Sequence, residues 1–158
     1  VDIDRAKLEK AKEFGATHTF INNTEDSNDE YTMKEALEIW RTSVNVVVET
    51  TGIPYLIEMA YQIVSAAGKI ILVGQPHHRE GLSINNFSSY YKGLTVKDSE
   101  GGLTQPAVDI PRYINLYKKG ILKLDSLITN TYTLDDIGNA ISDMRQGKVI
   151  GKCIITMN

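Results

Sequence analysis

The sequence predicts an α/β fold, a doubly wound parallel sheet with helices on both faces. Segments 44–48 and 69–73 are short and nearly continuously apolar, which is typical of strands buried on both faces. Segments with helical periodicity alternate with these strands through the first half of the chain. Right-handed crossovers between such strands build a doubly wound sheet.

The amino-terminal segments predict a helix, a strand and a second helix. Asp4 is suited to cap a helix whose apolar residues recur every third position until Gly15. Residues 17–21 are rich in β-branched and aromatic types and predict a strand. The polar stretch 22–30 then predicts a loop, and 32–41 a helix.

The middle of the chain repeats this alternation. The strand at 44–48 is followed by a helix that begins near Pro54 and is expected to end at Gly68. The next strand, 69–73, is closed by Gly74.

After this strand the rhythm changes, which indicates a boundary near residue 101. A last strand is predicted at 94–97, and Asp109 and Pro111 are expected to open a helix. An extended segment, a helix and a closing strand are predicted at 127–132, 134–147 and 150–156.

Composition excludes several classes of protein. The 158 residues carry 17 basic and 20 acidic side chains, a net charge of −3, so no basic surface for nucleic acid is expected. The one cysteine, Cys153, cannot form a disulfide within the chain or a cysteine-based zinc site. No apolar run approaches the ~20 residues of a membrane helix and no signal peptide is visible, so a cytoplasmic location is expected. Because the chain begins at Val1, it is expected to be a piece of a longer protein.

Two positions near the start are candidates for binding a nucleotide. Asp2 follows an apolar residue and precedes a helix, where an acid accepts hydrogen bonds from ribose hydroxyls in dinucleotide-binding units. The alternative is that Asp2 only caps the helix. Lys7, one turn into that helix, is placed to reach the same ribose. The glycine-rich turn of this motif would lie ~20 residues earlier, before residue 1.

Other residue types give weaker signals. The turns 49–52 and 73–76 end apolar strands, where ligands bind in open α/β sheets, but glycine and proline also mark ordinary turns. His77 and His78 have no further ligand at metal-binding spacing, and Cys153 is expected to be a buried small hydrophobe. We therefore predict no catalytic residue and no metal ligand in this chain.

Several segments together resemble the zinc-dependent medium-chain alcohol dehydrogenases. The matching pieces follow one another in the family's order and cover essentially the whole chain: 1–4 with Lys7, 11–17, 44–52, 68–74, 94–97 with 101–102, 109–113, 127–129 and 144–148. The resemblance implies a Rossmann-like sheet that lacks its first strand. It divides the chain into a partial dinucleotide-binding domain, 1–101, and a segment returning toward an absent catalytic domain, 102–158.

The resemblance also implies residue roles in binding NAD. Asp2 would bind the ribose with help from Lys7, and Ile3 would line the adenine pocket. Thr50 and Thr51 would lie beside the nicotinamide end. Three backbones would lie near the carboxamide, those of Val73, Gly74 and Ser99.

Further implications concern partners and activity. The edge strand 94–97 resembles the one that pairs across a two-fold axis in dimers of this family, which implies a homodimer. The family's zinc ligands lie upstream of the matched segment, so the parent enzyme would use zinc and NAD on a small alcohol or aldehyde. The chain alone is expected to be inactive. Two alternatives remain, a non-catalytic association module of the same fold and a methyltransferase domain with a nucleoside cofactor.

Overall fold

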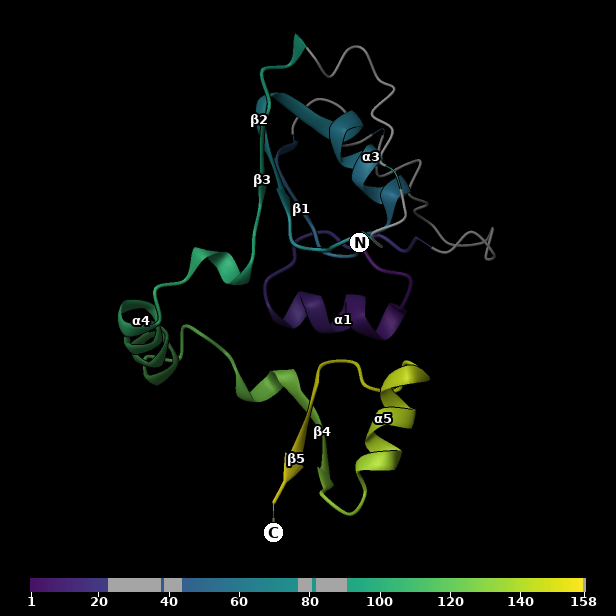
Figure 1. Ribbon diagram of the computed structural model, residues 1–158, viewed down its shortest axis with the longest axis vertical. Helices are drawn as coiled ribbons and strands as arrows, with labels where there is room; N and C mark the ends of the chain where they lie inside the picture. The colour runs from purple at the N-terminus through teal and green to yellow at the C-terminus, as the bar shows by residue number, and fades with distance from the viewer. Residues whose placement is uncertain (23–37, 39–43, 77–80, 82–90, 158) are drawn as a thin grey trace. The chain divides into compact units, whose positions relative to one another are not determined.

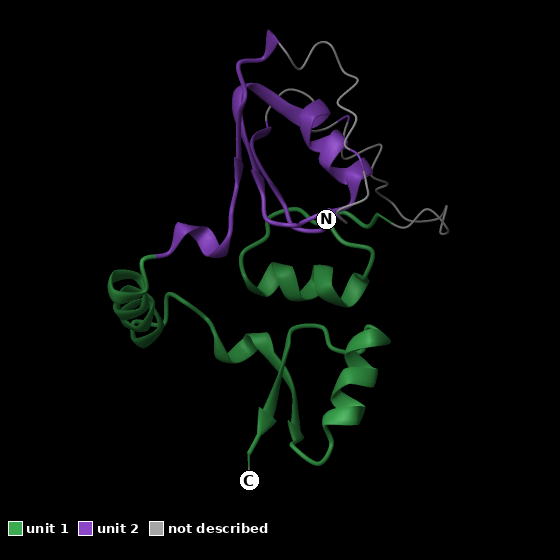
Figure 2. Ribbon diagram, viewed as in Figure 1, with its two compact units in different colours: residues 1–32, 105–158 green, residues 33–104 purple. Residues whose placement is uncertain are grey.

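The computed structural model describes residues 1–22, 38, 44–76, 81 and 91–157 (Figure 1). The chain divides into two compact units, one of residues 1–32 and 105–158 and one of residues 33–104 (Figure 2). The division near residue 104 lies close to the boundary expected at 101, but residues 1–32 group with the carboxyl-terminal segment. The functional division into 1–101 and 102–158 remains a prediction.

The second unit is built on a three-stranded parallel sheet. Its strands are β1 (Val44–Glu49), β2 (Val64–Leu72) and β3 (Thr95–Asp98), in the order β1-β2-β3. Both pairs are parallel, which confirms the prediction of an α/β fold with parallel strands. Helix α3 (Pro54–Ile63) begins at the predicted proline and packs on β1 and β2. The core cluster joins the helix to the sheet through Ala60, Val64 and Ile70.

The end of α3 differs from the prediction. The helix ends at Ile63, and β2 begins directly at Val64 instead of after a break at Gly68. The ammonium of Lys92, which is distant in sequence, donates to the carbonyls of Tyr61, Gln62 and Val64 at 2.9–3.0 Å. This cation satisfies the carbonyls that a helix end leaves without partners.

Gly68 has a different role from the predicted one. It lies inside β2, where the register against β1 shifts between Val44 and Val46. A Cβ on Gly68 would lie 2.6 Å from a methyl carbon of Val64 and 3.0 Å from the carbonyl oxygen of Asn45. Glycine is therefore required because the two strands approach closely at an irregular pair. In sequence, a glycine of this kind cannot be told apart from one that ends a helix.

The start of the first unit is a helix and one strand contact. Helix α1 (Arg5–Glu13) is capped by Asp4, whose carboxylate accepts from the N–H of Ala6 at 2.8 Å, as predicted. The strand expected at 17–21 is reduced to an isolated parallel bridge between Asp2 and Ile21. Among the described residues no further strand extends this bridge into a ladder. Most of the predicted loop 22–30 and helix 32–41 lies outside the described residues.

The rest of the first unit contains the carboxyl-terminal elements. Helix α4 (Pro106–Lys118) begins earlier than predicted, because Pro106 needs no N–H at its first turn and Asp109 accepts from the N–H of Gln105 at 2.8 Å. Pro111 lies inside this helix. The last elements are close to the predicted ranges: β4 (Ile128–Thr133), α5 (Ile137–Arg145) and β5 (Lys152–Thr156). Strands β4 and β5 form a parallel pair.

Two short 3₁₀ helices, η2 (Gly101–Leu103) and η3 (Asp125–Leu127), complete the described elements. In the part of the chain that the structure describes, no helix has the length and hydrophobicity needed to span a membrane.

Candidate functional site

The three strands of the second unit end in one row. Glu49 of β1 is paired with Leu72 of β2, which is paired with Asp98 of β3. The next residue of each strand therefore lies at the same carboxyl edge, and the N–H of Ser99 donates to the carbonyl of Leu72 at 2.8 Å. Parallel register thus gathers one set of predicted site residues: Thr50, Thr51, Val73, Gly74 and Ser99.

Two loops at this edge pack backbone against backbone. Gly52 has a φ of +73°, in the left-handed region that favours glycine. A Cβ on Gly74 would lie 2.6 Å from the carbonyl carbon of Thr51, so no side chain fits there. The N–H groups of Val73 and Gly74 donate to the carbonyl of Glu49 at 2.8 and 3.1 Å. The loops following β1 and β2 therefore form one continuous backbone surface.

A buried carboxylate holds the first of these loops. Glu49 is 6% exposed and is the buried charged residue among the described positions. Its Oε1 accepts from the N–H of Thr51 at 2.7 Å and from the Thr51 hydroxyl, and its Oε2 accepts from the N–H of Gly52 at 3.0 Å. Sequence analysis assigned no role to Glu49. The available signal was an acid directly after a strand of four valines and one asparagine, 44–48, and before Thr-Thr-Gly.

The remaining predicted site residues lie in the first unit. Asp2 is half-buried, and its Oδ1 accepts from the N–H of Asp4 at 3.0 Å. The cap of α1 is Asp4, so capping is not what Asp2 does. Ile3 is 71% exposed, and Lys7 is half-buried one turn into the helix. The two groups of site residues thus belong to different units, and their union in one cofactor site remains a prediction.

A metal centre would require several ligating side chains close together among the described positions. There, no three His, Cys, Asp or Glu side chains come together in a way that would hold a metal ion. Cys153 is partly exposed instead of buried, and its sulfur lies 3.6 Å from that of Met144. His77 and His78 lie outside the described residues.

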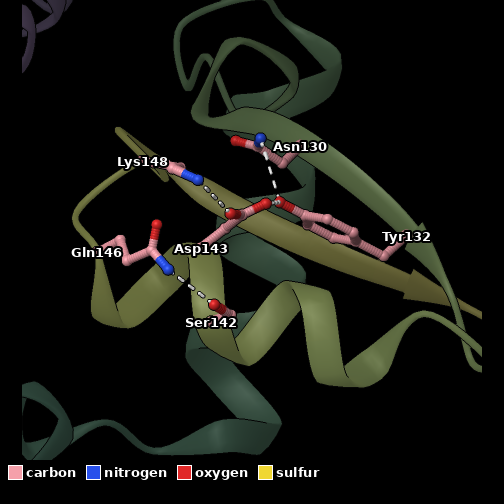
Figure 3. A network of polar contacts seen from close by, with 6 residues as sticks. All are labelled: Asn130, Tyr132, Ser142, Asp143, Gln146 and Lys148. Atoms are coloured by element: carbon pink, nitrogen blue, oxygen red, sulfur yellow. Dashed lines mark hydrogen bonds and ion pairs between the residues drawn. The ribbon is translucent and has the colours of Figure 1, made fainter.

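A second polar network joins α5 to β4 (Figure 3). The hydroxyl of Tyr132 donates to Asp143 at 3.0 Å, and Lys148 donates to the same carboxylate at 3.1 Å. The hydrogen bond from Lys148, followed by that from Tyr132, lowers the pKa of Asp143. Desolvation, followed by the bond to Asp143, raises the pKa of Tyr132. The hydrogen bond between Tyr132 and Asp143 thus links the strand β4 to the helix α5.

These features define a class of protein. A parallel α/β sheet with glycine loops at the carboxyl edge is the architecture in which nucleotides bind. The chain belongs to the zinc-binding dehydrogenase family, whose sequence profile matches residues 1–119. This membership confirms the resemblance inferred from sequence and favours it over the methyltransferase alternative.

Individual relatives agree with the family. The chain is 31% identical to the NDMA-dependent alcohol dehydrogenase of Amycolatopsis methanolica, over 95% of this chain and 40% of that protein. It is 32% identical to alcohol dehydrogenase-like 5 of Arabidopsis thaliana, over 100% of this chain and 40% of that protein. The crystal structure of benzyl alcohol dehydrogenase from Acinetobacter calcoaceticus superposes with a TM-score of 0.84 at 30% identity, covering 99% of this chain and 41% of that chain. The chain thus spans about two-fifths of the length of these relatives.

Proposed function

We propose that this chain is the NAD-binding portion of a zinc-dependent alcohol dehydrogenase. The parent enzyme would transfer a hydride between a small alcohol or aldehyde and nicotinamide. The observation that carries the proposal is the common carboxyl edge of β1, β2 and β3, where register aligns Thr50, Val73 and Ser99. Membership of the zinc-binding dehydrogenase family supports the same activity.

The residues near the amino terminus fit the adenosine half of NAD. Among the described residues the carboxylate of Asp2 accepts one hydrogen bond, from the N–H of Asp4. A carboxylate has about four acceptor sites, so ribose hydroxyls can be accommodated. Lys7 would assist at the ribose, and the exposed Ile3 would cover the adenine. The negative charge of Asp2 would repel a 2′-phosphate and so favour NAD over NADP.

The edge loops fit the nicotinamide half. Thr50 and Thr51 would lie beside the ring, and the backbones of Val73, Gly74 and Ser99 would orient the carboxamide. NAD supplies the hydride chemistry when it is bound. The task of this chain is to hold the cofactor in place through close backbone approach.

The proposal extends to the parent protein. Its zinc ligands would come from outside this chain, so the isolated chain would show no turnover. Strand 94–97 would pair with its copy in a homodimer, since all residues of β3 are exposed, and the enzyme would work in the cytoplasm. Size-exclusion chromatography with light scattering tests the dimer.

Cofactor binding is tested by calorimetry on the longest natural protein that carries this chain. Asp2→Asn is expected to weaken NAD binding at least tenfold, because a hydrogen bond to a charged group contributes about 1.5–3 kcal/mol. It should also reduce the preference for NAD over NADP.

Asp4→Asn is the matched control, since asparagine is as good a helix cap as aspartate and Asp4 is assigned no ligand. Equal loss of binding in both variants would contradict the role of Asp2. No binding of NAD by the unmodified protein would overturn the proposed function.

A further inference from the structure

The side chain of Glu49 organises the loop at the carboxyl edge of β1. Its two oxygens accept from three donors, the N–H and hydroxyl of Thr51 and the N–H of Gly52. Glu49 is 6% exposed and Gly52 is buried, so water is not available to replace the hydrogen bond between them. A buried donor that loses its acceptor is costly, so the loop has one favoured shape while the carboxylate is present.

The Thr51 hydroxyl connects Glu49 to the start of α3 through two hydrogen bonds. Its proton points to Glu49, and its oxygen accepts from the N–H of Ile53 at 3.1 Å. Ile53 is the residue that precedes the first turn of α3. The hydroxyl therefore bridges Glu49 and the helix, and its single proton is already in use.

The main chain of Glu49 holds the neighbouring loop. Its carbonyl accepts from both Val73 and Gly74. One residue thus fixes the two loops that pack against each other at Gly52 and Gly74.

We infer that Glu49 is a positioning residue for the cofactor, acting through Thr51 to hold the edge loops in their binding shape. This inference rests on the proposed function. Thr50 and Thr51 are both exposed, but the Thr51 hydroxyl already bridges Glu49 and Ile53, so Thr50 is the threonine assigned to the ligand. Only a carboxylate suits the position. A glutamine would turn an amide donor toward either Thr51 or Gly52, both of which are donors already.

The test compares NAD with ADP-ribose, which shares the adenosine and both ribose positions but has no nicotinamide. Calorimetry on the longest natural protein with Glu49→Gln is expected to show about a tenfold loss of NAD affinity and a loss of less than about twofold for ADP-ribose. Hydrogen exchange should show faster exchange at the N–H groups of 51–53 and 73–74, with the rest of β1 and β2 unchanged.

Variants of Thr51 test the bridge. Thr51→Ala removes the hydroxyl and should reproduce the NAD-specific loss, whereas Thr51→Ser keeps the hydroxyl and should restore binding. Glu13→Gln is the control for loss of one negative charge, because Glu13 is 59% exposed at the end of α1.

The outcomes separate this inference from the proposed function. If the unmodified protein binds NAD but Glu49→Gln loses NAD and ADP-ribose equally, or loses neither, the positioning role is wrong. Failure of Thr51→Ser to restore binding would also overturn it. If the unmodified protein binds neither ligand, the proposed function itself fails.

Discussion

Two polar networks in this chain use similar groups in different surroundings. The carboxylate of the Glu49 network is buried, and its donors include backbone N–H groups of the same turn. The Tyr132 network joins side chains only, and its ion pair has Lys148 61% and Asp143 29% exposed. Buried polar groups are costly to leave unpaired, whereas water replaces the partners of exposed ones. Burial, and not the number of hydrogen bonds, therefore sets how strongly each network constrains the fold.

The apolar residues of the same two regions differ in the same way. Ile57 and Ile70 in the second unit are 0% exposed. On α5, beside the Tyr132 network, Ile137 and Ile141 are 45% and 46% exposed. The second unit thus has a buried cluster between α3 and β2, although Val46 and Val48 of β1 are 53% and 57% exposed. On α5 the one buried residue described is Ala140.

The largest expected difference between the regions comes from core truncation. Ile70→Ala should lower the free energy of unfolding by about 3–4 kcal/mol, because it removes buried methyl groups and leaves a cavity. Ile141→Ala, at a 46% exposed position, should cost less than about 1 kcal/mol. Urea denaturation of the purified protein measures both, and equal losses would contradict the contrast.

A smaller effect is expected where the two edge loops meet. Gly74→Ala should cost about 3 kcal/mol, since its Cβ would overlap the backbone of Thr51. Gly138→Ala is the control, because no atom lies within 4 Å of its Cβ position in α5. There alanine should stabilise by about 0.5–1 kcal/mol. Thermal unfolding distinguishes the two, and similar midpoints would mean that the loops are not in close contact.

Lys92, whose ammonium binds the carbonyls at the end of α3, should contribute still less to the free energy of unfolding. Lys92→Met keeps the aliphatic chain but leaves three carbonyls without their donor, at a cost of about 1–2 kcal/mol. Lys119→Met, on an exposed lysine after α4, should be neutral within about 0.5 kcal/mol. Denaturation curves for both variants provide the comparison, and no loss in Lys92→Met would remove the proposed cause for the early end of α3.

The smallest effect is expected in the Tyr132 network and depends on pH. Because the pKa of Asp143 is lowered in the folded state, its contribution is present above the ordinary aspartate pKa and is lost as pH falls below it. Asp143→Asn should therefore lower the melting temperature slightly at pH 7 and not at pH 2–3. A difference that persists in acid would show that packing, and not charge, links α5 to β4.

The raised pKa of Tyr132 affects stability at high pH. Its contribution is present below the ordinary tyrosine pKa and is lost as pH rises through the folded value. The melting temperatures of Tyr132→Phe and of the unmodified protein should thus differ least in strong alkali.

Much of the candidate site follows from local sequence. Apolar strands that end in glycine turns predicted which loops lie at the carboxyl edge, and the structure aligns them there by parallel register. Asp4 and Pro54 are helix starts that a short window of sequence reveals, because caps and first-turn prolines act within a few residues. Glu49 was missed, since its importance comes from burial and not from its neighbours in sequence.

The sequence by itself determined the order of the described helices and strands from residue 44 onward, the parallel sheet and the family to which the chain belongs. These features depend on periodicity and on residues close together in the chain. The tertiary structure decided where α3 ends, because the capping ammonium comes from Lys92, 28–31 residues away. It also decided that 17–21 forms only a bridge and that Gly68 serves a close strand contact. Lys92 for α3, Asp2 for the bridge at Ile21 and Asn45 for Gly68 lie on other segments of the chain, which no local pattern contains.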